Sequence, residues 1–198
     1  AQEGAADPDD LRGGARAPRR FVGWQTFFDF GGPFTADVRP NKLMDTRIST
    51  PLFHLPVRAI AGLETGVTAL PQRNLLRQVT WGLPSGQSVA RHLGVPALAS
   101  GDLTELRGFG LELDRCTPLW YYVLKEAEVV EGGLRLGPVG GRIVGEVIVG
   151  LLQLDRDSFL SVPGWRPTLP TRNGQVTGDF AMANFLTFAG VDPTSRGQ

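Results

Sequence analysis

The chain has 198 residues, of which 41% are hydrophobic and 20% are charged, and its formal net charge is zero. The apolar content is enough for a packed core, and the length suits one large domain or part of one. A neutral chain gives no electrostatic argument for binding nucleic acid or an anionic membrane, so we predict neither partner. The 26 glycines and 15 prolines predict loop-rich connections between helices.

Two regions are predicted at the start of the chain. Residues 1–18 are rich in Ala, Gly, Asp and Arg and predict a loop or a mobile tail. Residues 19–198 follow as one helical portion. Its first helix is expected over residues 20–30, where Phe21, Trp24 and Phe28 recur at helical spacing and predict a helix that buries aromatic rings.

Residues 70–84 form the most informative stretch and read LPQRNLLRQVTWGLP. Pro71 suits the first turn of a helix, because the N–H that proline lacks has no intrahelical partner there. Gly82 and Pro84 are typical of the end of such a helix. Asn74 and Arg77 are three residues apart, so they project from one face of it.

The same stretch contains three apolar residues, Leu75, Leu76 and Val79, which predict a core helix. An amide and a guanidinium among such neighbours need partners, because unpaired buried polar groups are costly. The local sequence offers no obvious partner. We therefore expect another group to meet Asn74 and Arg77.

Start signals predict four more helices after this stretch. Ser85 is expected to cap a short helix, and Thr117 is expected to cap a helix that begins at Pro118 and continues through Val130. Pro138 begins a long helix that ends at Leu154, and Asp179 caps a last helix over residues 180–188. A further turn is expected over residues 102–107. Because alternation of period two is scarce, the fold class is mainly α with few or no strands.

Other features bound the class of protein. The most apolar stretch, residues 143–154, is shorter than the roughly 20 residues that span a bilayer, so we predict no transmembrane segment. Cys116 is the single cysteine, which excludes an internal disulfide, and we interpret it as a buried thiol rather than one that pairs with another chain. No cluster of His, Cys and Asp has zinc spacing, so no metal site is predicted.

The spacing of Leu-Pro, Asn74, Arg77 and Gly-Leu-Pro resembles the animal-type haem peroxidase superfamily, the myeloperoxidase and cyclooxygenase group. A bacterial branch of it has segments similar to RNLLR…GLPSGQ, TPLWYY and PGWRPTLP, which lie here at residues 73–87, 117–122 and 163–170. The resemblance extends from about residue 21 to residue 189. It implies the C-terminal portion of the helical peroxidase fold.

The resemblance also implies a haem on one face of the helix in residues 70–84. Asn74 would accept a hydrogen bond from the second ring nitrogen of the proximal histidine, which fixes its tautomer and basicity. Arg77 would pair with a haem propionate. Leu70 and Arg73 are assigned to the same cofactor-binding side. The animal enzymes have an apolar residue at the position of Arg73. Three roles are therefore open for Arg73: it reaches a propionate, it alters access to the haem, or it points away from the haem.

The resemblance leaves the catalytic residues unknown. The proximal and distal histidines, and a calcium loop, are expected in an N-terminal portion present as a separate chain or segment. His54 and His92 are the two histidines here, and their sequence contexts differ from that of a proximal ligand. We interpret both as ordinary surface or half-buried residues.

The implied activity is that of a haem-dependent peroxidase, which reduces hydrogen peroxide and oxidises a small donor or a halide. One alternative is a fatty-acid dioxygenase of the same superfamily, which would need an upstream catalytic tyrosine because Tyr121 and Tyr122 lie on a different helix. The other alternative is a haem-less structural or interaction subunit. The compartment stays open, with a secreted or periplasmic location favoured.

Overall fold

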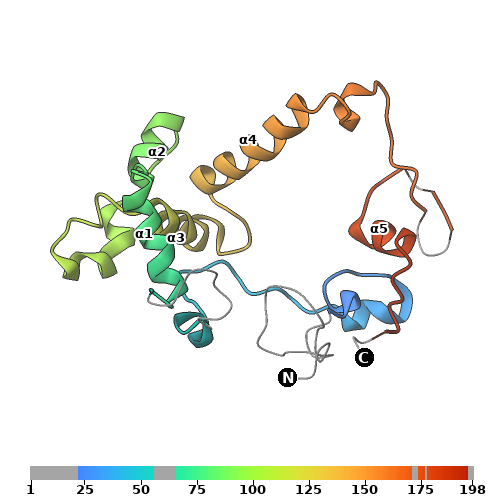
Figure 1. Cartoon of the computed structure of the whole chain (residues 1–198), viewed down its shortest axis with the longest axis horizontal. Coiled ribbons are helices and arrows are strands. Elements are labelled where there is room, and N and C mark those ends of the chain that lie inside the picture. The colour runs from blue at the N-terminus through green and yellow to red at the C-terminus, as the bar shows by residue number, and fades with distance from the viewer. Residues whose placement is uncertain (1–21, 56–65, 171–173, 177, 196–198) are drawn as a thin grey trace. The chain divides into compact units, whose positions relative to one another are not determined.

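The computed structural model describes residues 22–55, 66–170, 174–176 and 178–195. Its α-helices are α1 (Leu70–Thr80), α2 (Gly86–Leu93), α3 (Leu119–Glu131), α4 (Pro138–Leu154) and α5 (Met182–Phe188) (Figure 1). The 3₁₀ segments are Trp24–Thr26, Gly32–Asp37, Thr50–Phe53, Ser100–Phe109 and Phe159–Ser161. These described ranges contain no β-strand, and Ser85 and Pro118 form an isolated antiparallel bridge. The prediction of a mainly α fold is confirmed.

The chain divides into two compact units. One unit is Leu43–Asp155, which contains α1 to α4, and the other combines Ala1–Lys42 with Arg156–Gln198 and contains α5. The tail predicted for residues 1–18 lies outside the described residues. The single helical portion predicted for residues 19–198 stays a prediction.

The core of the unit Leu43–Asp155 lies where α2, α3 and the start of α4 pack together. Its buried apolar residues are Ala90, Leu98, Leu103, Leu106, Tyr122 and Val139. The Tyr122 ring is fully buried, and its hydroxyl accepts a hydrogen bond from the Leu98 N–H at 2.8 Å. A Cβ on Gly86 would lie 1.9 Å from Cγ of Tyr122. The first residue of α2 therefore has to be glycine, because no other side chain fits beside the ring.

Two glutamines hold the start of α3. The buried Gln87 donates from Nε2 to Thr117 Oγ1 at 2.8 Å and accepts from the Thr117 N–H at 3.0 Å. Gln78 of α1 accepts a hydrogen bond from the Leu119 N–H at 3.0 Å. Pro118 takes the N-cap position, so the prediction that Thr117 caps this helix is wrong by one residue. The reason is that Gln87 already binds Thr117 outside the helix.

The start of α4 is capped by a carboxylate from α3. Glu126 is 1% exposed, and its Oε2 accepts hydrogen bonds from the Val139 N–H at 2.9 Å and the Gly140 N–H at 3.1 Å. A Cβ on Gly137 would lie 2.4 Å from Cγ of Glu126, so a glycine is needed beside the carboxylate. Burial raises the pKa of Glu126, although the two N–H groups lower it. The predicted start at Pro138 is confirmed.

Beyond its first turn, α4 is largely unpacked. Its buried residues are Val139 and Gly140, both at the N-terminal end. Figure 1 shows the helix extending away from the group formed by α1, α2 and α3. Its exposed apolar side chains are Val144, Val147, Ile148, Val149, Leu151 and Leu154. The length predicted from the sequence is therefore confirmed, whereas most of its apolar surface is not covered by the described residues of its own unit.

The other unit departs from two predicted helices. Over residues 22–30 only Trp24–Thr26 is helical, as a 3₁₀ turn, so the predicted aromatic helix is wrong for the described residues. Its continuation is opposed by Asp29, whose carboxylate accepts the Gly31 N–H at 2.7 Å and so favours a turn. The last helix begins at Met182 with Ala181 as N-cap, so the predicted cap at Asp179 is wrong.

Candidate functional site

The helix α1 has the bounds that the sequence predicts. Pro71 lies in its first turn, and Ala69 is the N-cap residue. The helix ends at Thr80, followed by Gly82 with a φ of 58° that favours glycine. Gln78 fixes the end, because its Nε2 donates to the Pro84 carbonyl at 3.0 Å. The same side chain joins α1 to the start of α3, so it sets the orientation of the helix.

The candidate residues share one face of α1. At 3.6 residues per turn, Leu70, Arg73, Asn74 and Arg77 fall within an arc of about 100° around the helix axis. Trp81, one residue after the helix, continues the same row because it follows Arg77 by four positions. The structure thus brings all four sequence-predicted site residues to one side of one element.

Asn74 and Arg77 are partners of each other. The guanidinium Nη1 of Arg77 donates to Asn74 Oδ1 at 3.1 Å. Asn74 is half-buried and Arg77 is exposed, so this pair lies at the surface of the described chain. The expectation that both side chains need partners is met in part by this short-range bond.

The prediction of a core helix is wrong for the described chain. No residue of α1 is buried, and the exposed fraction of the side chain at Val79 is 81%. Leu75 and Leu76 are also exposed. The physical reason is that α1 packs against α3 and the 3₁₀ segment Thr50–Phe53, and these contacts leave much of its surface open.

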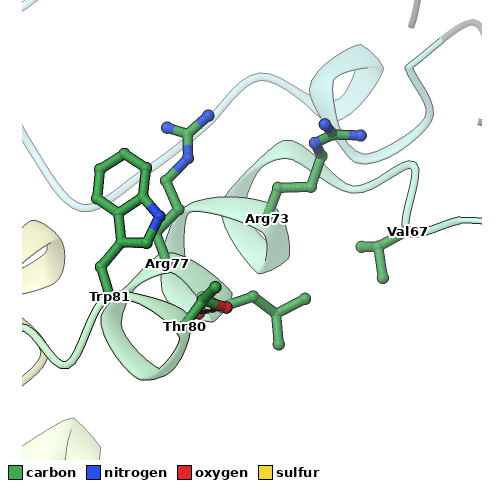
Figure 2. A pocket seen from close by; sticks show the side chains of 6 residues that line it. Val67, Arg73, Arg77, Thr80 and Trp81 are labelled. Atoms are coloured by element: carbon green, nitrogen blue, oxygen red, sulfur yellow. Dashed lines mark hydrogen bonds between the residues drawn. The ribbon is translucent and has the colours of Figure 1, made fainter. Parts of the chain in front are cut away.

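A pocket of about 310 Å³ lies beside this face of α1. Its lining residues are Val67, Arg73, Leu76, Arg77, Thr80 and Trp81. Figure 2 shows the guanidinium groups of Arg73 and Arg77 extending from the same side of the helix, with the Trp81 indole next to Arg77. Asn74 and Leu70 do not line the pocket, but they lie on the adjoining part of the face. The site therefore combines two cations, an amide and an exposed aromatic ring.

Trp81 is a site residue that the sequence analysis missed. Its side chain is exposed and lines the pocket, although it lies just past the helix end. Its spacing of four residues from Arg77 and eight from Arg73 is the signal that could have found it. Gly82 and Pro84, which follow Trp81, indicate a helix end and so mask this continuation of the face.

Charge is not balanced within the pocket. Among the described residues, neither Arg73 nor Arg77 forms an ion pair with a carboxylate, and α1 contains no acidic residue. Four other cations of the same unit do have such partners: Arg107 pairs with Asp114, Lys125 with Glu105 and Glu128, Arg135 with Glu131, and Arg142 with Glu146. Arg91 resembles Arg77 instead, because it donates to a neutral oxygen, Ser88 Oγ. The pocket is consequently suited to an anion.

The histidines lie apart from the pocket lining. His54 follows the 3₁₀ segment Thr50–Phe53, His92 lies on α2, and both are exposed. In the described ranges, no group of three or more His, Cys, Asp and Glu side chains could hold a metal ion. The interpretation of both histidines as ordinary surface residues agrees with their exposure.

Cys116 is exposed, so its interpretation as a buried thiol is wrong. It lies in a turn in which the N–H groups of Arg115 and Cys116 both donate to the Glu112 carbonyl at 2.9 Å. Glu112 itself has a φ of 49°, which tightens the turn. The side chain therefore projects from a loop rather than from the packed face of a helix.

A second polar cluster, on α3, has a structural role. The Tyr121 hydroxyl donates to Glu105 Oε1 at 2.8 Å, and Lys125 Nζ lies 3.3 Å from the same oxygen. Burial, followed by the bond to Glu105, raises the pKa of Tyr121 to about 12. Tyr121 therefore stays a neutral hydrogen-bond donor at physiological pH.

A second pocket, of about 220 Å³, lies between α3 and α4 and is almost wholly apolar. Its lining residues are Leu83, Leu119, Trp120, Val123, Leu136, Gly140, Ile143 and Val144. It contains no titratable side chain, so it offers no acid, base or ligand for a reaction.

No protein-family model, curated protein or solved structure matches the chain. Membership of the peroxidase superfamily therefore stays a prediction. In the ranges that the structure covers, none of the helices combines the length and the apolarity needed to cross a bilayer.

Proposed function

We propose that this chain is the C-terminal portion of an animal-type haem peroxidase and that α1 supports the proximal side of the haem. The observation that carries the proposal is the open face of α1, where an amide and two guanidinium groups are presented together. Their order and spacing are those for which the sequence resembles the superfamily. An N-terminal portion would complete the enzyme.

The residues fit a haem in chemical character. Haem has an apolar ring and two carboxylate groups, so it suits a surface that is partly apolar and partly cationic. Arg73 and Arg77 supply guanidinium groups, which bind carboxylates in a bidentate manner. The exposed Leu76 and Trp81 supply apolar contact area beside them.

Asn74 is suited to orient a histidine ligand. Its Oδ1 accepts one hydrogen bond from Arg77, and an amide oxygen has a second lone pair. That lone pair can accept the free N–H of an imidazole supplied by the N-terminal portion. Holding that N–H fixes the tautomer and the ring orientation of a metal-bound histidine. Arg77 in turn holds the amide of Asn74 in place.

The haem, when bound, supplies the two-electron reduction of hydrogen peroxide and the subsequent oxidation of a small donor or a halide. Residues of this chain bind and orient, and do not themselves exchange protons with peroxide. Asn74 fixes an imidazole, Arg77 binds a carboxylate, and Leu70 lies on the same face of the helix. The distal residues belong to the N-terminal portion.

The decisive experiment purifies this chain together with its N-terminal portion, as one protein or as two co-purifying chains. The expected result is a Soret band and peroxide-dependent oxidation of a donor such as guaiacol. The Asn74→Ala variant is expected to keep its helical circular dichroism and to lose roughly 10- to 100-fold in activity, because groups that hydrogen-bond to a metal ligand have effects of that size. Gln72→Ala is the matched control, since Gln72 is exposed on the opposite side of α1.

The other outcomes identify the alternatives. A purified protein without a Soret band would exclude a haem enzyme and leave a structural or interaction subunit. Oxygen uptake with a polyunsaturated fatty acid, in place of peroxide-dependent oxidation, would indicate a dioxygenase. An unchanged haem spectrum and activity in Asn74→Ala would contradict the role of Asn74.

A further inference from the structure

The apolar pocket between α3 and α4 shares no lining residue with the pocket on α1. Among its lining residues, only Trp120 has a polar side-chain atom, the indole nitrogen. An ordered water molecule in a cavity needs two to four polar partners, which such a lining does not offer. The pocket is therefore suited to an apolar occupant.

The α4 side of this pocket is held in place by hydrogen bonds. Glu126 of α3 accepts the N–H groups of Val139 and Gly140 at 2.9 and 3.1 Å, so the first turn of α4 is fixed to α3 beside the pocket. At Gly140 the two helices are in close contact, because an added Cβ would lie 3.2 Å from Cβ of Val123. The distance between the two helical walls is thereby set.

The other end of the pocket is held by Gln78. Its Oε1 accepts the Leu119 N–H at 3.0 Å, and its Nε2 donates to the Leu83 carbonyl. Both Leu83 and Leu119 line the pocket. Since hydrogen bonds connect its walls at both ends, the pocket is a preformed space and not a gap between loosely joined helices.

The volume and the lining restrict the class of ligand. An apolar cavity of roughly 150 Å³ holds one benzene ring, so the 220 Å³ of this pocket accommodates about two fused rings. A charged or hydrogen-bonding group in it would lose its hydration and gain no partner, which is costly. The indole of Trp120 adds a flat wall against which an aromatic ring packs favourably.

We infer that the space between α3 and α4 is a binding site for a small uncharged molecule with about two fused apolar rings. The site goes beyond the proposed function, because none of its lining residues belongs to the face of α1 assigned to the haem. The molecule is bound by packing and by removal of apolar surface from water. A protein partner would instead cover the outer part of α4, where exposed apolar side chains continue to Leu154.

The test titrates the full chain with naphthalene and with naphthalene-1,5-disulfonate, and follows the methyl NMR signals of Val, Leu and Ile. The disulfonate has a charge at each end of the rings, so no orientation leaves both charges in water. We expect saturable shifts with naphthalene at Val123 and Ile143, which line the pocket. The disulfonate should bind at least roughly 10-fold more weakly, because it would bury an unpaired charge.

Two variants with the same substitution locate the site. Val144→Phe enlarges a side chain that lines the pocket, and it should weaken naphthalene binding roughly 10-fold or more, since the added ring occupies part of the space. Val147→Phe is the matched control, because Val147 lies one turn further along α4, is exposed and does not line the pocket. Its affinity should equal that of the unmodified chain. The two-ligand comparison on the unmodified chain decides the matter even if Val144→Phe does not fold.

Four results would overturn the inference. Absence of saturable naphthalene binding would mean that the pocket is closed in solution, by the chain itself or by a second copy. Equal binding of the two ligands would contradict an apolar site. Shifts at Val147 as large as those at Val123 would indicate adsorption to the open surface of α4. Equal affinities of Val144→Phe and Val147→Phe would place the site elsewhere. The proposed function is unaffected by each of these results, because it is judged by the Soret band of the complete protein.

Discussion

The packed core around Tyr122 and the open face of α1 are built in opposite ways. In the core, the Tyr122 hydroxyl, the Gln87 amide and the Glu126 carboxylate all have hydrogen-bond partners inside the unit. On α1 no residue is buried, and the two arginines have no carboxylate partner among the described residues. Both regions belong to the same unit, and Gln78 connects them.

This difference separates the core groups, which stabilise the fold, from the α1 groups, which are open to a binding partner. Groups whose partners lie inside the unit contribute to its folding, so their removal should unfold it. Groups that are left open on α1 contribute little to folding, so their substitution should leave the fold intact and should affect only what binds there. Two results would contradict this division: a core substitution that leaves the free energy of unfolding unchanged, or an α1 substitution that unfolds the chain.

The largest expected effect is that of Gly86→Ala. A Cβ at this position would lie 1.9 Å from Cγ of Tyr122, and the ring is fully buried and cannot move aside. We expect the free energy of unfolding to fall by about 3 kcal/mol or more, at the upper end of overpacking effects. Urea unfolding followed by circular dichroism measures it.

The control for this substitution is Gly101→Ala. An added Cβ at Gly101 would meet no atom within 4 Å, so the change in unfolding free energy should stay within about 0.5 kcal/mol. Equal stability of the two variants would show that a Cβ at position 86 does not clash with the Tyr122 ring. In that case the described core would be wrong at its centre.

The sequence predicted the parts of this core that depend on neighbours along the chain. Ser85 caps α2, with its Oγ accepting the Ser88 N–H at 3.3 Å, and Pro138 opens α4, both as expected from short-range signals. The role of Glu126 could not be predicted, because the N–H groups that it binds follow it by 13 and 14 residues on another helix. Pairing across that distance depends on how α3 and α4 pack, and no local pattern encodes it.

The candidate site shows the same limit. Helical spacing was enough to place Asn74 and Arg77 on one face, because the period of an α-helix is fixed. Exposure could not be predicted, since Leu75, Leu76 and Val79 are as apolar as residues of a core helix. Whether such residues are buried depends on which other elements cover them. In the described chain, α3 and the 3₁₀ segment Thr50–Phe53 contact α1 and leave these three side chains exposed.

The second prediction removes the cap of α4. Glu126→Ala leaves the buried N–H groups of Val139 and Gly140 without an acceptor, and each unpaired buried donor costs about 1–3 kcal/mol. We expect the free energy of unfolding to fall by about 2–3 kcal/mol. Glu128→Ala is the matched control, because Glu128 is partly exposed and its pairing with Lys125 is worth about 1 kcal/mol or less. Similar losses in both variants would contradict the capping role.

The third prediction concerns pH. Burial raises the pKa of Glu126 above its ordinary value of 4.5, so the folded chain binds this proton more tightly than the unfolded chain does. The resulting stabilisation is present in full below pH 4.5 and is lost as the pH rises through the raised pKa. Asp114 and Glu105 have lowered pKa values and act in the opposite direction.

The contribution of Glu126 is isolated by comparison with Glu126→Gln, which cannot titrate. Urea midpoints of both proteins, measured from pH 4 to pH 7, should diverge in one way: the unmodified chain loses stability relative to the variant as the pH rises. A carbon-13 titration of the Glu126 carboxyl should place its midpoint above those of exposed glutamates. Parallel midpoints across the range would show that the pKa is not raised.

The smallest expected effect on stability is that of Asn74→Ala, and it is the sharpest test of the comparison. The amide of Asn74 bonds to the exposed Arg77, and exposed polar pairs contribute little, so the free energy of unfolding should change by about 0.5 kcal/mol or less. Under the proposed function, the same substitution should reduce the peroxidase activity of the complete protein many-fold. A loss of several kcal/mol would instead make Asn74 a folding residue, and any loss of activity could then be explained by unfolding. A stable but inactive variant would assign Asn74 to binding rather than to folding, because the loss of activity could not then be explained by unfolding.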